Sequence, residues 1–156
     1  MPATSVSEVL ACTDDFFTPH IPPHPYLKMI RDYIDIDRHW GILAYYDAIP
    51  SDFLQLAPIL REFGCPEHEI EKAHQTIRLP NKAFVFNAPW FRMSVIVVGR
   101  VTHPAQFLNS FMHEVDHLQK AILSYYDVPQ GTEDAAYLQG FIGQVAYEAI
   151  LPLLCP

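Results

Sequence analysis

The sequence contains little charge, and most of that charge is acidic. Only 18% of the 156 residues are charged, and 10 basic residues stand against 18 acidic ones, for a formal net charge of −8. Proteins bind nucleic acid backbones mainly through clustered Lys and Arg, so we expect no nucleic acid partner. No apolar run approaches the roughly 20 residues that a membrane-spanning helix needs. We therefore expect no membrane partner either.

Cysteine is also scarce. The three cysteines, Cys12, Cys65 and Cys155, are odd in number and scattered, so they indicate neither a disulfide framework nor a metal-ligand pair. The N-terminal residues contain no basic segment followed by an apolar one, and no secretory signal is expected. These absences together predict a cytoplasmic protein.

What the chain does contain suits one folded domain, residues 1–156. Half of its residues are apolar and 13% are aromatic. A chain of this length buries roughly two-thirds of its unfolded surface. Residues 1–24 are the exception, because they are rich in turn-forming residues and end in prolines around His20 and His24. We expect this segment to be an extended arm.

The order of predicted elements indicates an α+β fold. Apolar residues at spacings of three and four predict helices over residues 26–40, from Ser51 to about Gly64, and from Pro66 to about Ile77. Two short segments rich in β-branched and aromatic residues predict a small antiparallel or mixed sheet. The later elements are strands at 82–87 and 92–99, a long helix from 104 to about 124–126, and a last helix over 133–150.

The segment most informative about chemistry is Ser110–His117, within the long predicted helix. His113 and His117 are four residues apart, so a helix stacks their imidazoles where both can bind one metal ion. Glu114 projects about a quarter-turn away, beside the metal rather than on it, where it can take a proton from water. On the same helix, Phe111 and Val115 occupy the opposite arc. The helix thus separates a core face from a histidine face.

A helix with this HExxH motif after a small sheet resembles the zincin metallopeptidases. The metzincin branch is excluded, because Lys120 and Leu123 stand where its pattern needs Gly and His. The segment 133–137, Glu-Asp-Ala-Ala-Tyr, resembles the downstream glutamate motif of gluzincins. Residues 83–143 are also similar to compact zincin domains found in gut Bacteroidales and their phages or mobile elements.

This resemblance implies a function and a set of site residues. His113, His117 and Glu133 would bind Zn²⁺, and Glu114 would be the general base. A peptidase also needs a donor that stabilises the tetrahedral intermediate, and of Tyr125, Tyr126 and Tyr137 we favour Tyr137. The strand at 82–87 would hold a peptide or protein substrate in extended form along the edge of the sheet.

Two features depart from the gluzincin pattern. Tyr137 occupies the position where these enzymes place an acid that orients a ligand histidine. In addition, a helix running to Tyr126 would end roughly 13 Å beyond His117. Either that helix stops early, near Leu123, or the loop folds back to bring Glu133 to the metal; otherwise Glu148 is the alternative third ligand.

Three functions therefore remain open, and the oligomeric state is not predicted. The first is a zinc-dependent peptidase. The second is a non-catalytic, zinc-stabilised binding or regulatory module of a phage or mobile element. The third is a structural protein in which the motif arose by chance.

Overall fold

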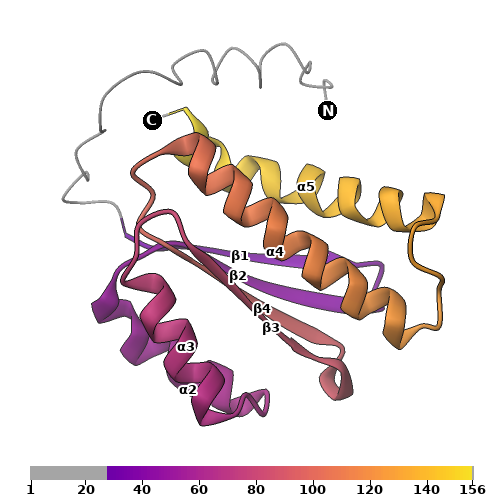
Figure 1. Ribbon diagram of the computed structural model, residues 1–156, viewed down its shortest axis with the longest axis horizontal. Coiled ribbons are helices and arrows are strands. Elements are labelled where there is room, and N and C mark those ends of the chain that lie inside the picture. The colour runs from indigo at the N-terminus through magenta and orange to yellow at the C-terminus, as the bar shows by residue number, and fades with distance from the viewer. Residues whose placement is uncertain (1–27, 156) are drawn as a thin grey trace.

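The computed structural model of this protein describes residues 28–155, and the arm expected over residues 1–24 lies outside them. In the described part, four α-helices and four strands form an α+β fold (Figure 1). None of these helices is both long and apolar enough to cross a membrane. The elements are β1 (Ile30–Ile36), β2 (Trp40–Ala48), η1 (Pro50–Asp52), α2 (Phe53–Glu62), α3 (Glu67–Ile77), β3 (Ala83–Ala88), η2 (Pro89–Phe91), β4 (Met93–Gly99), α4 (Pro104–Tyr125) and α5 (Glu133–Leu154).

The strands form one mixed sheet in the order β1-β2-β4-β3. The central strands β2 and β4 run parallel, and each edge strand pairs antiparallel with its central neighbour. Within residues 28–155, β3 is therefore an edge strand, and its outer side has no strand partner. This confirms the predicted small sheet as a mixed one.

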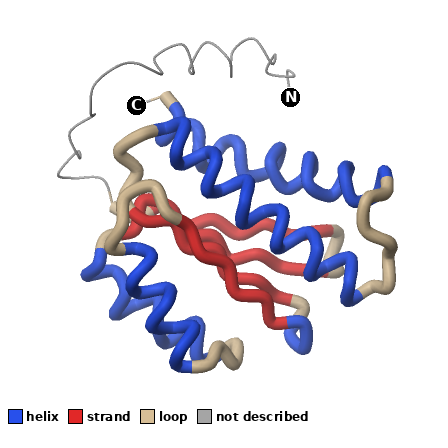
Figure 2. Tube along the Cα trace, viewed as in Figure 1, coloured by secondary structure: helices blue, strands red, loops and turns tan. Residues whose placement is uncertain are grey.

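Helices cover both faces of the sheet (Figure 2). On one face, Phe107 and Phe111 of α4 pack edge-on against Tyr46 of β2, and all three are fully buried. On the other face, Leu60 of α2 and Ile77 of α3 belong to a second buried cluster. The sheet is thus the middle of three layers, with a separate apolar core on each face.

The helix predicted over residues 26–40 is wrong, because residues 30–36 form strand β1. Ile30 and Ile34 are four positions apart, a spacing that puts two side chains on one side of either a helix or a strand. Asp37 and Arg38, both at positive φ, then turn the chain into β2. Pairing with β2 along the whole of β1 decides in favour of the strand.

Strand β2 was not predicted at all. It is buried at every position but Leu43, because it lies in the middle of the sheet with helices on both faces. A strand buried on both faces lacks the alternation of polar and apolar residues by which strands are recognised in a sequence.

The other predicted elements are confirmed, and their ends have local causes. Pro66 is the N-cap of α3, and Pro104 is the first residue of α4, where a missing N–H costs nothing. Thr132 caps α5, since its hydroxyl accepts a hydrogen bond from the N–H of Ala135.

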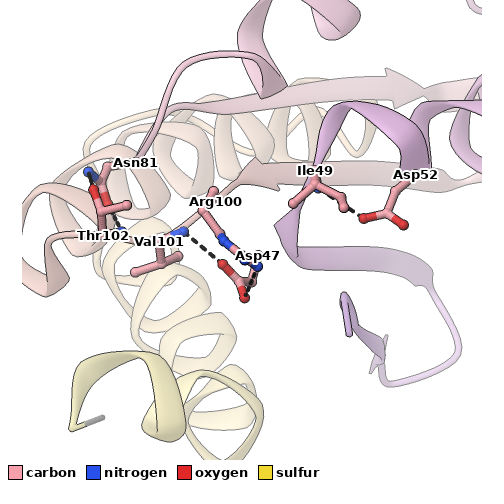
Figure 3. A network of polar contacts seen from close by, with 7 residues as sticks. All are labelled: Asp47, Ile49, Asp52, Asn81, Arg100, Val101 and Thr102. Carbon is pink, nitrogen blue, oxygen red and sulfur yellow. Dashed lines mark hydrogen bonds and ion pairs between the residues drawn. The ribbon is translucent and has the colours of Figure 1, made fainter. Parts of the chain in front are cut away.

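A buried asparagine holds the segment that leads into α4 (Figure 3). The Oδ1 atom of Asn81 accepts hydrogen bonds from the N–H groups of Thr102 and His103, both at 2.9 Å. Its Nδ2 donates to the hydroxyl of Thr102 at 2.9 Å and to Gln106 at 3.4 Å. Asn81 thus ties the loop before β3 to the first turn of α4.

Asp47 holds the same segment from the end of β2 (Figure 3). Its Oδ1 accepts a hydrogen bond from the N–H of Val101 at 2.8 Å, and its Oδ2 pairs with Arg100 at 3.5 Å. Burial raises the pKa of Asp47, while the bonds to Val101 and Arg100 oppose that rise. Together with Asn81, this carboxylate fixes where α4 starts relative to the sheet.

The cysteines behave differently from one another. Cys65 is free and buried, whereas Cys155 is disulfide-bonded. The sequence predicts no disulfide framework and contains no signal for this single bond, since number and spacing along the chain do not report distances in space.

We expect Cys65 to resist alkylation in the folded protein. Burial raises the pKa of its thiol to about 11, and the nearby Glu69 and Glu67 add to that rise. The reactive thiolate is therefore scarce at about pH 8. Mass-spectrometric mapping after iodoacetamide treatment should show Cys65 modified only in denaturant. Equal modification of the native protein would contradict this expectation.

Candidate metal centre

Helix α4 positions the candidate site. Its buried residues Phe107, Phe111, Val115, Leu118 and Ile122 recur at spacings of three and four, so they form one continuous face against the sheet. The predicted histidine pair lies on another part of the helix surface and is exposed. The expected separation of a core face from a histidine face is thus confirmed.

The two histidines converge as a metal site requires. The Nε2 atoms of His113 and His117 are 3.1 Å apart, and the two rings stand at 79° to each other with centroids 4.7 Å apart. Two nitrogen ligands at about 2.0–2.1 Å from a tetrahedral zinc ion stand about 3.3 Å apart. The pair therefore fits zinc with shifts of only a few tenths of an ångström.

Glu114 lies beside the pair, on the side of α4 that faces the edge strand. Its carboxylate is half-buried and accepts a hydrogen bond from the backbone of Val85 in β3. Burial raises the pKa of Glu114, while the nearby His117 and His113, the Val85 backbone and the more distant Lys72 lower it. The predicted base is therefore next to the histidines and at the margin of the sheet.

In the part of the chain that the structure describes, no third metal-binding side chain accompanies the pair. In residues 28–155, no group of three or more His, Cys, Asp or Glu side chains is placed to hold a metal ion. Helix α4 contacts β3 and β4, whereas α5 contacts β1, so α5 lies beside α4 on the flank away from β3 (Figure 1). Glu133 and Glu148 are both exposed on α5. They are therefore on the flank of α4 opposite the one where Glu114 lies.

The length of α4 adds to this separation. The helix continues to Tyr125, so the early end near Leu123 that would favour Glu133 as a ligand does not occur. The end of α4 lies roughly 12 Å beyond His117, and α5 begins only after a further loop. Tyr137, the expected stabiliser of the intermediate, is on α5 with 73% of its surface exposed. The structure thus brings together His113, Glu114 and His117, but not Glu133 or Tyr137.

Two contributors to the site were missed in the sequence. The backbone of Val85 contacts the Glu114 carboxylate, and Lys72 reaches it electrostatically from α3. Neither carries a local signal, because a backbone group has no residue identity and Lys72 sits on an ordinary solvated helix. The pairing of β3 at the edge of the sheet places Val85 near α4, and the packing of α3 against β3 and β4 places Lys72 there.

No known family, curated protein or solved structure matches this chain. The class that its fold and site suggest therefore rests on the chain's own residues.

Proposed function

We propose that this protein is a zinc-dependent metallopeptidase of the HExxH type. The observation that carries the proposal is the geometry of α4. His113 and His117 present their Nε2 atoms 3.1 Å apart, and Glu114 lies beside them at the edge strand. A pair of surface histidines without function would not require a half-buried carboxylate between them and the sheet.

Each residue of the motif has a distinct role in this proposal. His113 and His117 hold the metal through Nε2, and zinc bound there would acidify water and polarise a peptide carbonyl. Glu114 takes the proton of the attacking water on its carboxylate and passes it to the leaving amine. Its hydrogen bond to the Val85 backbone orients that carboxylate.

In this proposal, a peptide substrate binds along the edge strand β3. Its outer side has no strand partner within the described residues, so an extended peptide can add there by backbone hydrogen bonds. Since Glu114 contacts this strand at Val85, a peptide bound along β3 lies next to the base. The substrate class in this proposal is an extended peptide or an unfolded protein segment.

The third protein ligand in the proposal is Glu133, with Glu148 as the alternative. Both are exposed, and neither is tied to a partner by an ion pair within residues 28–155. For either to reach the histidines, the contact between α4 and α5 must change when zinc binds. Water would occupy whatever position the protein leaves open.

One observation favours the second function, a zinc-stabilised module without turnover. The described residues supply only two convergent ligands, whereas catalytic zinc sites usually have three protein ligands. Such a module, the binding or regulatory protein of a phage or mobile element considered above, would bind zinc but hydrolyse nothing.

Zinc is expected to stabilise the wild-type protein through the histidine pair. At a zinc concentration about a hundred times the dissociation constant, the free energy of unfolding should rise by about 2.7 kcal/mol. This corresponds to an increase in melting temperature of about 5–10 °C. His113→Gln should abolish most of the shift, since it removes one of two convergent ligands. Differential scanning fluorimetry with and without zinc measures both.

A matched control and the two carboxylate variants complete this experiment. His68→Gln changes an exposed histidine of α3 that pairs with Glu69, and it should keep the full shift. Whichever of Glu133→Gln and Glu148→Gln reduces the shift identifies the third ligand. An absent shift in the wild type, or an equal shift in His113→Gln, would contradict zinc binding at α4.

A further inference from the structure

A cavity of about 330 Å³ lies at the end of the sheet where β1 turns into β2 and β3 turns into β4. Gly41 and Met93 form the floor of the cavity. Side chains two positions apart in a strand point to the same face of the sheet, and Leu43 and Val95, two positions further along, belong to the core under α2 and α3. The floor is therefore on the face that α2 and α3 cover. The histidine pair is on α4, above the other face. The cavity is therefore separate from the candidate metal centre.

Two arginines line this cavity, one from each turn. Arg38 lies between β1 and β2, and Arg92 lies between η2 and β4. Within the described residues, neither guanidinium has an ion pair. In a chain with a net charge of −8, a lining with two arginines and one acid, Asp35, carries a net positive charge.

Both arginines have backbone conformations that are unfavourable for arginine. Arg38 has φ of 61° and Arg92 has φ of 49°, both in the left-handed region where glycine or asparagine fits with less strain. The turns alone would be better built without arginine. Strained positions of this kind cluster at binding sites, where the side chain is needed for another reason.

The lining is mostly polar, and its aromatic side chains and Met93 add a smaller apolar part. Tyr33 and Phe91 line the cavity and are 57% and 52% exposed. At Gly41, a Cβ atom would lie 2.5 Å from the sulfur of Met93 and 2.8 Å from the hydroxyl of Tyr33. Glycine at this position therefore lets both side chains lie across the strand and form the floor.

The one acid in the lining is already engaged with the turn. Asp35 Oδ1 accepts a hydrogen bond at 2.9 Å from the backbone N–H of Arg38. The imidazole ring of His39, also in the lining, adds a further nitrogen donor. The backbone carbonyl of His39 accepts a hydrogen bond from the hydroxyl of Tyr126 at 2.7 Å. The polar side chains of the cavity thus favour an anion over a cation.

We propose that this cavity binds a small molecule that carries an oxyanion, phosphate or carboxylate, on a flat apolar body. Arg38 and Arg92 bind the oxyanion, because guanidinium groups match both anions in geometry and charge. Tyr33, Phe91 and Met93 contact the apolar body. The volume is at the lower end of the range for small-molecule sites, which suits a small ligand.

Isothermal titration calorimetry with four probes tests this proposal on the full-length protein. Phenyl phosphate and benzoate share a ring and differ in the anion, benzamide has the ring without charge, and inorganic phosphate has the charge without the ring. We expect binding of phenyl phosphate, benzoate or both, weaker binding of inorganic phosphate, and none of benzamide. The stronger of the first two identifies the oxyanion.

The variants Arg38→Asn and Arg92→Asn make the test specific. Asparagine suits the left-handed backbone, so each variant should unfold at the same or a higher denaturant concentration than the wild type. Each should weaken binding by about tenfold, and the double variant should abolish it. Arg78→Asn, at the exposed end of α3, is the control and should bind as the wild type does.

The proposal is overturned if no anionic probe binds the wild type at millimolar concentration, if benzamide binds as well as benzoate, or if the double variant still binds. None of these measurements involves zinc or peptide hydrolysis. The cavity and the metal centre can therefore fail independently.

Discussion

Glu114→Gln is expected to reduce peptide hydrolysis by about 10²–10⁴-fold while zinc still binds. Glutamine keeps the size of the side chain and the oxygen that accepts from the Val85 backbone, but it cannot take a proton from water. Burial raises the pKa of Glu114, so its charged form is already disfavoured in the folded protein. Removing the charge should therefore leave stability unchanged or slightly higher.

The experiment compares cleavage of a mixed peptide library by mass spectrometry, with zinc content measured for each protein. Asp116→Asn is the matched control, since Asp116 is on the same helix next to His117 but pairs with Lys120. It should cleave as the wild type does. Equal cleavage by Glu114→Gln would exclude Glu114 as the base. A zinc-loaded wild type that cleaves nothing would support the module without turnover.

The Asn81 variants are expected to have the largest effect on stability. Asn81→Ala leaves the N–H groups of Thr102 and His103 without their acceptor and puts alanine at φ of 60°. We expect the free energy of unfolding to fall by about 2–4 kcal/mol, from unsatisfied donors and from left-handed strain. Urea denaturation monitored by circular dichroism measures this loss.

Two further variants separate these causes. Asn81→Gly loses the same hydrogen bonds without the strain, so it should be more stable than Asn81→Ala by about 1 kcal/mol. Asn81→Asp keeps the two acceptor interactions but loses the donation to Thr102 and buries a charge. A loss below about 0.5 kcal/mol in Asn81→Ala, the size of an ordinary surface effect, would show that Asn81 does not hold the start of α4.

The predictions that succeeded depended on local signals. Pro66 and Pro104 stand at the starts of two predicted helices, where the missing N–H of proline costs nothing. The geometry of His113 and His117 also follows from a helix alone, because a spacing of four residues stacks two side chains in any helix. The structure confirms these predictions.

The predictions that failed concern contacts between elements. Ile30 and Ile34 fit either a helix or a strand, and only pairing with β2 decides between them. Where Glu133 lies relative to the histidines likewise depends on a contact between elements, the packing of α5 against α4 and β1, and Glu133 stays a proposed ligand. The cavity with Arg38 and Arg92 forms where two turns meet that are far apart in the sequence.

Because most of the charge in the sequence is acidic, we expect no nucleic acid partner, and the spacing of the motif puts two histidines and a glutamate close together on one helix. These properties follow from composition and helical geometry, which need no tertiary contacts. The tertiary structure alone decided that β3 is the edge strand beside Glu114 and that α5 lies on the far flank of α4. It also placed two arginines together at one cavity. Such arrangements depend on how apolar faces pack against the sheet, and a linear pattern does not record which face meets which.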